Sequence, residues 1–216
     1  MGASLADQAG APAGGAPSLA IALGGNLPSP VGDPLATLLA VRPLLETLLR
    51  GLGEVVRWSP LFRTVPVGGP PGQPDYLNAA VLVSPVLPGT PARAMQLLQE
   101  LHQLEQRFAR QRLVRWGPRS LDLDLLWWGD LECSCEQLEL PHPRLLERAF
   151  VLAPLAAIDG ALRPPGAGVS AIDQLRRLSR SSAAPAPEPL AGCPGWPESG
   201  FTTGAVPPAP PGPDQG

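Results

Sequence analysis

Two acidic residues, Asp122 and Asp124, stand two positions apart in a segment where the alternate positions are leucine. Leu121, Leu123 and Leu125 give this segment a period of two, which predicts a β-strand with both carboxylates on one face. Neighbouring carboxylates on an apolar strand repel each other and resist desolvation, so they need a cation. A hard divalent ion such as Mg²⁺ meets that need and often accompanies nucleotide phosphates. The alternative is a solvent-facing pair on an edge strand.

A cluster of arginines surrounds the start of this strand. It consists of Arg107, Arg110, Arg112, Arg115 and Arg119. Guanidinium groups donate paired hydrogen bonds to phosphate oxygens, so arginines beside two carboxylates indicate phosphoryl transfer. The alternative is a solvated helix end whose positive charges interact with the helix dipole.

The chain contains no lysine, because all 16 of its basic residues are arginine. This excludes a P-loop lysine, a Schiff-base lysine and the strand lysine of protein kinases. The segment Gly24-Gly25-Asn26 also lacks the further glycines and the Lys-Ser/Thr pair of a phosphate loop. We therefore expect a phosphate site built from arginine and backbone amides.

The two ends of the chain differ in composition from its middle. Residues 1–17 are mostly Ala, Gly and Pro, and residues 181–216 hold ten prolines and six glycines. Such segments bury too little apolar surface to offset their chain entropy, so we predict that both are disordered. Residues 18–180 remain as one domain, with a formal charge near +1, and this excludes the basic surface of a nucleic-acid-binding protein.

The same composition predicts a cytoplasmic protein that does not enter a membrane. No apolar run reaches the length of a membrane span, and residues 1–17 lack the basic and apolar regions of a signal peptide. Cys133, Cys135 and Cys193 are odd in number and form no CxxC pair, so we expect free thiols in a reducing compartment.

The order of the predicted elements gives the fold class. Short apolar or alternating runs predict strands at 19–23, 55–58, 77–86 and 121–128. The Asp33-Pro34 and Thr90-Pro91 pairs are helix starts, followed by apolar stripes to Leu49 and Phe108, and Pro43 should kink or split the first helix. This order predicts an α+β, ferredoxin-like split βαβ sandwich with helices on one face of an antiparallel sheet.

Two long connections and several aromatic or amide side chains are candidate binding groups. Loops 63–76 and 110–120 are long for a compact domain, which is typical of lids and binding loops. Tyr76 and Asn78 share one side of a strand start and offer a stacking face together with an amide, as a planar ring substrate requires. Tyr76 and Trp116 also suit structural anchors, and a lone His142 or a Phe150 in an apolar run is more often structural.

Five segments, taken in order, resemble one enzyme family. They are IALGGNL (21–27), FRTVPV (62–67), QPDYLNAAV (73–81), RWGPRSLDLDLL (115–126) and LPHPRLLERAFVL (140–152). Together they closely resemble 6-hydroxymethyl-7,8-dihydropterin pyrophosphokinases, over about residues 19–160. The resemblance implies transfer of pyrophosphate from ATP to the hydroxymethyl group of a reduced pterin, with two Mg²⁺ ions, by a monomer.

The resemblance also implies roles for individual residues. Asp122 and Asp124 match the metal ligands, and Arg110 and Arg119 match the catalytic arginines. The positions that match pterin-binding residues are Thr64, Val67, Tyr76, Asn78 and Phe150. The positions that match residues near ATP are Glu105, Arg112, Trp116, His142 and Arg148. The chain departs from the family at Gly25, where Ser is frequent, and at Ala109, where Gly usually precedes the loop arginine.

Two other functions would use some of the same features. A nucleotide-sugar transferase also uses an Asp-x-Asp pair, but it would not need Tyr76 and Asn78 beside an arginine loop. A ferredoxin-like RNA-binding domain would need exposed aromatic residues on its central strands, where this chain has Leu123 and Leu125. We therefore expect small-molecule substrates and no nucleic-acid partner.

Overall fold

A computed structural model describes residues 17–109, 117–181, 184–192 and 196 of the chain. Its elements follow in the order β1 (Leu19–Gly25), α1 (Pro34–Leu49), β2 (Gly53–Trp58), β3 (Phe62–Thr64), β4 (Tyr76–Val86), α2 (Pro91–Arg107), β5 (Asp122–Trp128), β6 (Cys133–Ser134), β7 (Glu139–Leu140), a 3₁₀ turn η1 (Leu145–Glu147), α3 (Ala149–Ile158), α4 (Ala171–Ser181) and β8 (Glu188–Pro189).

The main sheet is antiparallel and has the order β5-β1-β4-β3-β8, with β2 also pairing with β4. The four predicted strands are confirmed as β1, β2, β4 and β5, and both predicted helix starts carry their caps. The Asp33 carboxylate accepts from the Ala36 N–H at 2.8 Å, and the Thr90 hydroxyl accepts from the Arg93 N–H at 3.3 Å. The α+β class is therefore confirmed, and α1 runs unbroken through Pro43.

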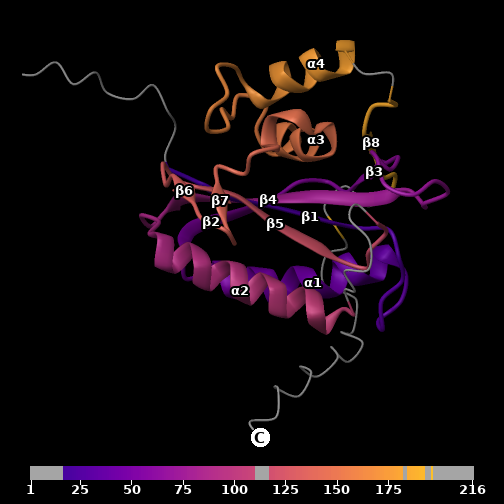
Figure 1. Cartoon of the computed structure of the whole chain (residues 1–216), viewed down its shortest axis with the longest axis horizontal. Coiled ribbons are helices and arrows are strands. Elements are labelled where there is room, and N and C mark those ends of the chain that lie inside the picture. Colours follow the sequence, from indigo (N-terminus) through magenta and orange to yellow (C-terminus); the bar gives the residue numbers. More distant parts are fainter. Residues whose placement is uncertain (1–16, 110–116, 182–183, 193–195, 197–216) are drawn as a thin grey trace, which may run out of the picture.

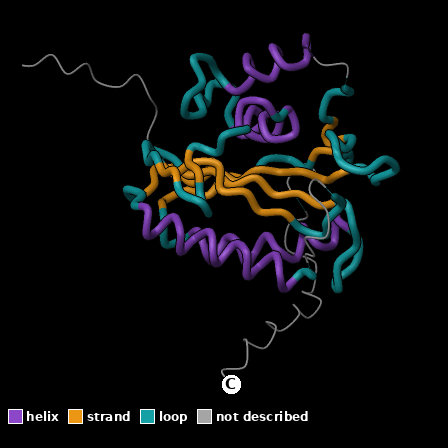
Figure 2. Tube along the Cα trace, viewed as in Figure 1, coloured by secondary structure: helices purple, strands orange, loops and turns teal. Residues whose placement is uncertain are grey.

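Helices cover both faces of this sheet, whereas the sequence predicted helices on one face only. Helices α1 and α2 lie below the sheet in Figure 1, and α3 and α4 lie above it. Figure 2 shows the resulting three layers, with strands between two layers of helix. Helix α3 has the sequence AFVLAPLAAI, and an apolar run of this kind has no polar face that would reveal a helical period.

The side chains of β1 explain why both faces need cover. Leu19, Ile21 and Leu23 join the core formed with α1 and α2, whereas Ala20 joins the core formed with α3 and α4. Because successive side chains of a strand point to opposite faces, small alanines leave room for α3 close to the sheet. None of the helices in the described residues has the length and apolarity that crossing a membrane requires.

The chain beyond Ser181 differs from the predicted disordered tail wherever the structure describes it. Residues 188–189 form β8 on the edge of β3, and Trp196 is buried against Trp58. Composition predicts disorder only from an average, and a single large aromatic ring in a Pro-rich segment can supply the buried area that the rest lacks. Cys133 and Cys135 are free thiols, as expected, and Cys193 lies outside the described residues.

Candidate active site

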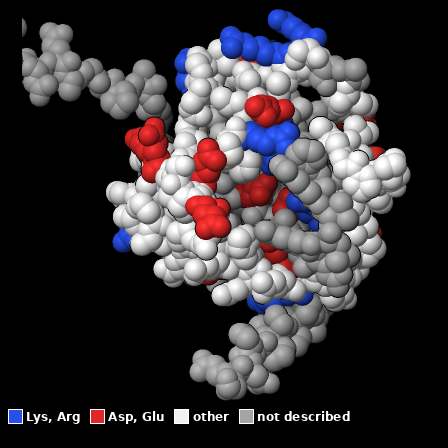
Figure 3. Space-filling model, viewed as in Figure 1, with Lys and Arg blue, Asp and Glu red and all other residues white. Residues whose placement is uncertain are grey.

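A pocket of about 230 Å³ opens between the sheet and the α3–α4 layer. Its walls include parts of β1, β3, β4, β5, α3 and α4, which are far apart in the sequence. Figure 3 shows acidic and basic side chains gathered around the hollow on this side of the molecule. The pocket therefore combines apolar strand ends with charges of both signs.

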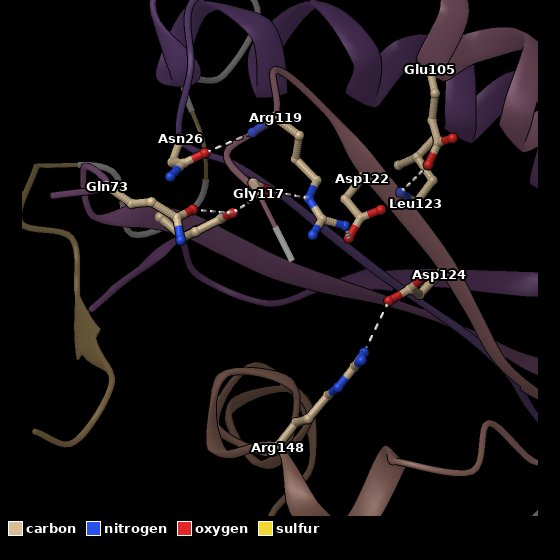
Figure 4. Close-up of polar contacts among 10 residues, drawn as sticks. Asn26, Gln73, Glu105, Gly117, Arg119, Asp122, Leu123, Asp124 and Arg148 are labelled. Atoms are coloured by element: carbon tan, nitrogen blue, oxygen red, sulfur yellow. Dashed lines mark hydrogen bonds and ion pairs between the residues drawn. The ribbon is translucent and has the colours of Figure 1, made fainter. Parts of the chain in front are cut away.

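Both predicted metal ligands lie on the pocket side of β5, and each is paired with an arginine. The Asp122 Oδ2 atom accepts from Arg119 Nη1 at 2.7 Å, and the Asp124 Oδ2 atom accepts from Arg148 Nη1 at 3.2 Å (Figure 4). Arg119 precedes β5, and Arg148 is the N-cap residue of α3. Asp122, Arg119 and Arg148 line the pocket. The structure thus places predicted phosphate-binding arginines against the predicted metal ligands.

Asn26, at the end of β1, holds Arg119 in place. Its Oδ1 atom accepts from the Arg119 N–H at 2.9 Å, and its backbone N–H donates to the Arg119 carbonyl oxygen at 2.9 Å. Its Nδ2 atom donates to the Pro74 carbonyl oxygen at 3.0 Å, so one buried amide joins both candidate binding loops to β1. The neighbouring Gly25 allows this approach, because a Cβ atom there would collide with the Ser120 carbonyl oxygen.

The predicted pterin-binding residues all line the same pocket. The Asn78 Nδ2 atom donates to Thr64 Oγ1 at 2.7 Å, and the Asn78 Oδ1 atom occupies the space where a Cβ atom of Gly24 would lie. The amide of Asn78 is therefore fixed on both sides, in a buried position. Such an amide presents one donor and one acceptor edge to a planar ring.

Two aromatic side chains, Tyr76 and Phe150, line the same pocket as this amide. The Tyr76 hydroxyl donates to the Gly117 carbonyl oxygen at 3.1 Å, which also accepts from Arg119 Nε at 3.3 Å. Phe150, on α3, lies under the Arg148 guanidinium, whose central carbon is 5.6 Å from the ring centroid. Burial acts to lower the pKa of Arg119, but the neighbouring Asp122 and Tyr76 groups raise that pKa above its ordinary value. Arg119 is therefore cationic at every working pH.

His142 lies between β7 and η1 as a neutral ring. Burial, followed by the positive charge of Arg148, lowers the pKa of His142 from 6.5 to about 4. Its Nδ1 atom accepts from the Arg144 N–H at 3.1 Å, which assigns the ring proton to Nε2. The imidazole can therefore act as a neutral donor through Nε2 near pH 7.

Some predicted site residues lie apart from the pocket or outside the described residues. Glu105, on α2, is buried and accepts from the Leu123 N–H at 2.7 Å, so it supports β5 from the face opposite to the pocket. Its contact with ATP stays a prediction. Val67 lines the pocket, yet 64% of its surface is exposed. Arg110, Arg112 and Trp116 lie outside the described residues.

Sequence reasoning missed Asn26, Gly24 and the wall of the pocket formed by residues 184–187. The sequence excludes the Gly24-Gly25-Asn26 segment as a phosphate loop, and the family resemblance assigns it no role in the site. A signal for its true role was present, because two glycines at the end of a buried strand often mark a close approach of backbone. No sequence pattern indicated that residues 184–187 line the pocket.

The donor set on β5 suits Mg²⁺. Among the described residues, no group of three His, Cys, Asp or Glu side chains gathers as a metal site, so the protein offers two carboxylates alone. Mg²⁺ typically binds through one or two carboxylates and takes its other ligands from substrate phosphates and water. Asp122 and Asp124 fit that arrangement, and they do not fit an ion that requires a cage of protein ligands.

Comparison with known proteins agrees with this geometry. Residues 20–160 match the family model described as 7,8-dihydro-6-hydroxymethylpterin-pyrophosphokinase (HPPK). The chain is 38% identical over 187 residues to the 2-amino-4-hydroxy-6-hydroxymethyldihydropteridine pyrophosphokinase of Synechocystis, which covers 86% of this chain and 89% of the relative. It is 40% identical over 138 residues to the enzyme of that name from Bacillus subtilis, covering 64% of this chain and 75% of the relative.

The fold is also found in solved structures. The wild-type HPPK-DHPS of Plasmodium falciparum, crystallised with pterin and p-hydroxybenzoate, superimposes with a TM-score of 0.53 at 14% identity. The match covers 79% of this chain and 44% of that longer chain, and at this identity it supports the fold alone. The model match and the close relatives decide the family. The chain belongs to the 7,8-dihydro-6-hydroxymethylpterin-pyrophosphokinase family.

Proposed function

We propose that the pocket holds a reduced pterin beside the β- and γ-phosphates of ATP, and that Asp122 and Asp124 bind the Mg²⁺ ions of the reaction. Membership of the family makes the chain a pyrophosphokinase of folate biosynthesis that uses ATP. The observation that supports the residue roles is the placement of Asp122 and the five candidate pterin residues around one pocket.

In this proposal the pterin lies in the pocket that Tyr76 and Phe150 line, and these two rings stack on it. The fixed amide of Asn78, with Thr64 behind it, meets the donor and acceptor edge of the ring. The hydroxymethyl group then points toward Arg119 and Asp122, which line the same pocket. Val67 sits on the loop before Gly68 and Gly69, whose φ angles of 79° let that loop turn sharply at the pocket's edge.

The reaction joins the hydroxymethyl oxygen to the β-phosphorus of ATP. The bond between this phosphorus and the oxygen shared with the α-phosphate breaks, AMP leaves with the electron pair, and the hydroxyl proton passes to solvent. When bound at Asp122 and Asp124, Mg²⁺ neutralises phosphate charge and lowers the hydroxyl pKa. Positioning and charge stabilisation then carry most of the catalysis.

Arg119 and Arg148 change partners in this scheme. Each donates to a carboxylate in the structure, and each can donate instead to a phosphate oxygen when ATP and metal are present. His142, neutral and protonated at Nε2, adds a donor without adding charge. The site therefore keeps its charges compensated before and after substrate binds.

The test is AMP formation from ATP and Mg²⁺, with and without 6-hydroxymethyl-7,8-dihydropterin. We expect AMP and the pterin diphosphate in equal amounts, and no AMP above background without the pterin. The Asn78→Ala variant should raise the KM for the pterin far more than the KM for ATP, because in this proposal the Asn78 amide contacts the pterin ring and does not contact ATP. AMP release independent of the pterin would refute the assignment of the pocket.

A further inference from the structure

The C-terminal strap, defined as residues 184–192, crosses from the α4 layer to the edge of the sheet (Figure 1). Within it, β8 pairs with β3 through Phe62 opposite Pro189 and Arg63 opposite Glu188. The Leu190 N–H continues this pairing by donating to the Leu61 carbonyl oxygen at 2.8 Å. The strap is thus attached to the strand that carries Thr64.

The first part of the strap is a wall of the substrate pocket. Residues 184–187, with the sequence APAP, line the pocket that Thr64, Asn78 and Phe150 also line. Two prolines in four residues fix much of the backbone, so this wall loses little entropy on ordering. Alanine at the other two positions leaves room for a ligand.

Trp196 anchors the chain just beyond the strap. Its ring is 2% exposed, and its Nε1–H donates to the Ser59 carbonyl oxygen at 2.8 Å. Its centroid lies 5.2 Å from that of Trp58, and the central carbon of the Arg42 guanidinium lies 5.1 Å from it. Ser59 and Trp58 come just before β3, so the anchor and the wall act on the same edge of the sheet.

The backbone at Trp196 shows that this contact is tightly specified. Its φ angle is 60°, in the left-handed region that bulky residues rarely adopt. A residue stays in this region when surrounding contacts outweigh the strain. The hydrogen bond, the two ring contacts and the burial of the indole supply those contacts here.

We propose that the strap completes the pterin-binding pocket and that Trp196 is the positioning residue that holds it there. This inference rests on the proposed function, because it takes the pocket to be the pterin site. Trp196 itself touches no substrate in this arrangement. It acts on pterin affinity through residues 184–187.

Two alanines of the strap allow a direct test in the full-length chain. Ala186 lines the pocket and Ala191 does not, and both are exposed, so A186F and A191F place the same ring inside and outside the pocket. Calorimetry with Mg²⁺, a non-hydrolysable ATP analogue and 6-hydroxymethyl-7,8-dihydropterin should show pterin affinity about 10-fold weaker for A186F. A191F should bind the pterin as the wild type does, and both should keep the affinity for the ATP analogue.

The anchor is tested with W196A, W196F and L101A. Leu101 is buried on α2 in the same core that holds Trp196, so L101A destabilises that core but leaves the Trp196 indole and its bond to Ser59 in place. We expect W196A to raise the KM for the pterin about 10-fold with kcat nearly unchanged. W196F keeps an aromatic ring at this position, so its KM for the pterin should stay close to that of the wild type. L101A should lower the melting temperature and leave both KM values unchanged.

The outcomes separate this inference from the proposed function. If the wild type binds no pterin, the proposed function fails. If the wild type binds pterin and A186F binds it equally well, the strap is no wall of the site and the inference is wrong. If W196A and L101A weaken pterin and ATP alike, Trp196 only stabilises the fold, and its positioning role is refuted.

Discussion

Arg148 donates to Asp124 across 3.2 Å, from the N-cap of α3 to the middle of β5. This ion pair joins the α3–α4 layer to the sheet at the edge of the pocket. The side chains of Arg148 and Asp124 are 18% and 33% exposed, so the pair is open enough to exchange its arginine for other partners. Under the proposed function, Asp124 would bind metal and Arg148 would bind phosphate, and in the structure the two groups satisfy each other.

Removal of either carboxylate should abolish chemistry and leave the fold intact. We expect Asp122→Asn and Asp124→Asn to lower turnover by at least about 10². AMP formation at saturating Mg²⁺ checks this, and near-normal activity in both variants would show that these acids do not hold the metal.

The same substitutions also test the resting ion pairs. From the sequence alone, losing one of two repelling acids should leave the apo protein equally or more stable, but each acid has an arginine partner in the structure. Partly exposed pairs contribute about 0–1 kcal/mol, so Asp124→Asn should change the free energy of unfolding by no more than that. Urea unfolding measures it, and a gain of several kcal/mol would mean that carboxylate repulsion dominates.

Arg119 and Arg148 should matter more for turnover than for ATP binding. If each donates to phosphate chiefly in the transition state, Arg→Ala at either position should lower kcat by about 10²–10⁴ and change the Kd for an ATP analogue far less. Arg→Lys should restore little, because an ammonium group lacks the planar fork. A variant that loses affinity and turnover in equal measure would assign its arginine to ground-state binding.

His142 should make stability depend on pH in the acidic range. Because its pKa falls from 6.5 to about 4 in the folded state, the unfolded chain binds a proton that the folded chain does not between these values. Stability is therefore lost as pH falls from 6.5 toward 4. Urea unfolding of His142→Asn, which keeps an acceptor for the Arg144 N–H, should show a smaller loss over this range.

Measurements at pH 7.5 serve as the control for this variant. Both proteins then carry a neutral group at position 142, so any difference in their free energies of unfolding reports lost packing and not a difference in proton binding. An unchanged slope between pH 4 and 6.5 would contradict the assigned pKa.

The stabilising role of Trp196 can be separated from the rest of the C-terminal segment. A chain that ends after Trp196 should melt near the temperature of the full chain, since the sequence predicts no packed core in residues 197–216. A chain that ends after residue 183 loses β8 and the buried indole, and it should melt several degrees lower. Equal melting temperatures would show that the strap contributes nothing to stability.

Local patterns predicted β1, β2, β4, β5, α1 and α2, but not α3, α4 or the contacts between layers. The period of two around Asp122 and Asp124 was enough to place both acids on one face. The partner of Asp124 lies 24 residues further on, next to an apolar helix without a visible period. Trp196 bonds to Ser59 across 137 residues, and no local pattern encodes a contact of that range.

Asn26 is the residue that this structure adds to the site, and its two amide atoms can be tested one at a time. Asn26→Asp keeps an oxygen for the Arg119 N–H but places an oxygen against the Pro74 carbonyl, whereas Asn26→Ala removes both contacts. An unsatisfied buried polar group costs about 1–3 kcal/mol, so both variants should have a lower free energy of unfolding than the wild type. Asn26→Ala should also lower kcat, because it no longer holds Arg119 in place. Because Asn26→Asp keeps the bond to Arg119, its kcat should stay nearer to the wild type. Steady-state kinetics decide the matter: equal losses of kcat would mean that Asn26 acts through loop 63–76 and not through Arg119.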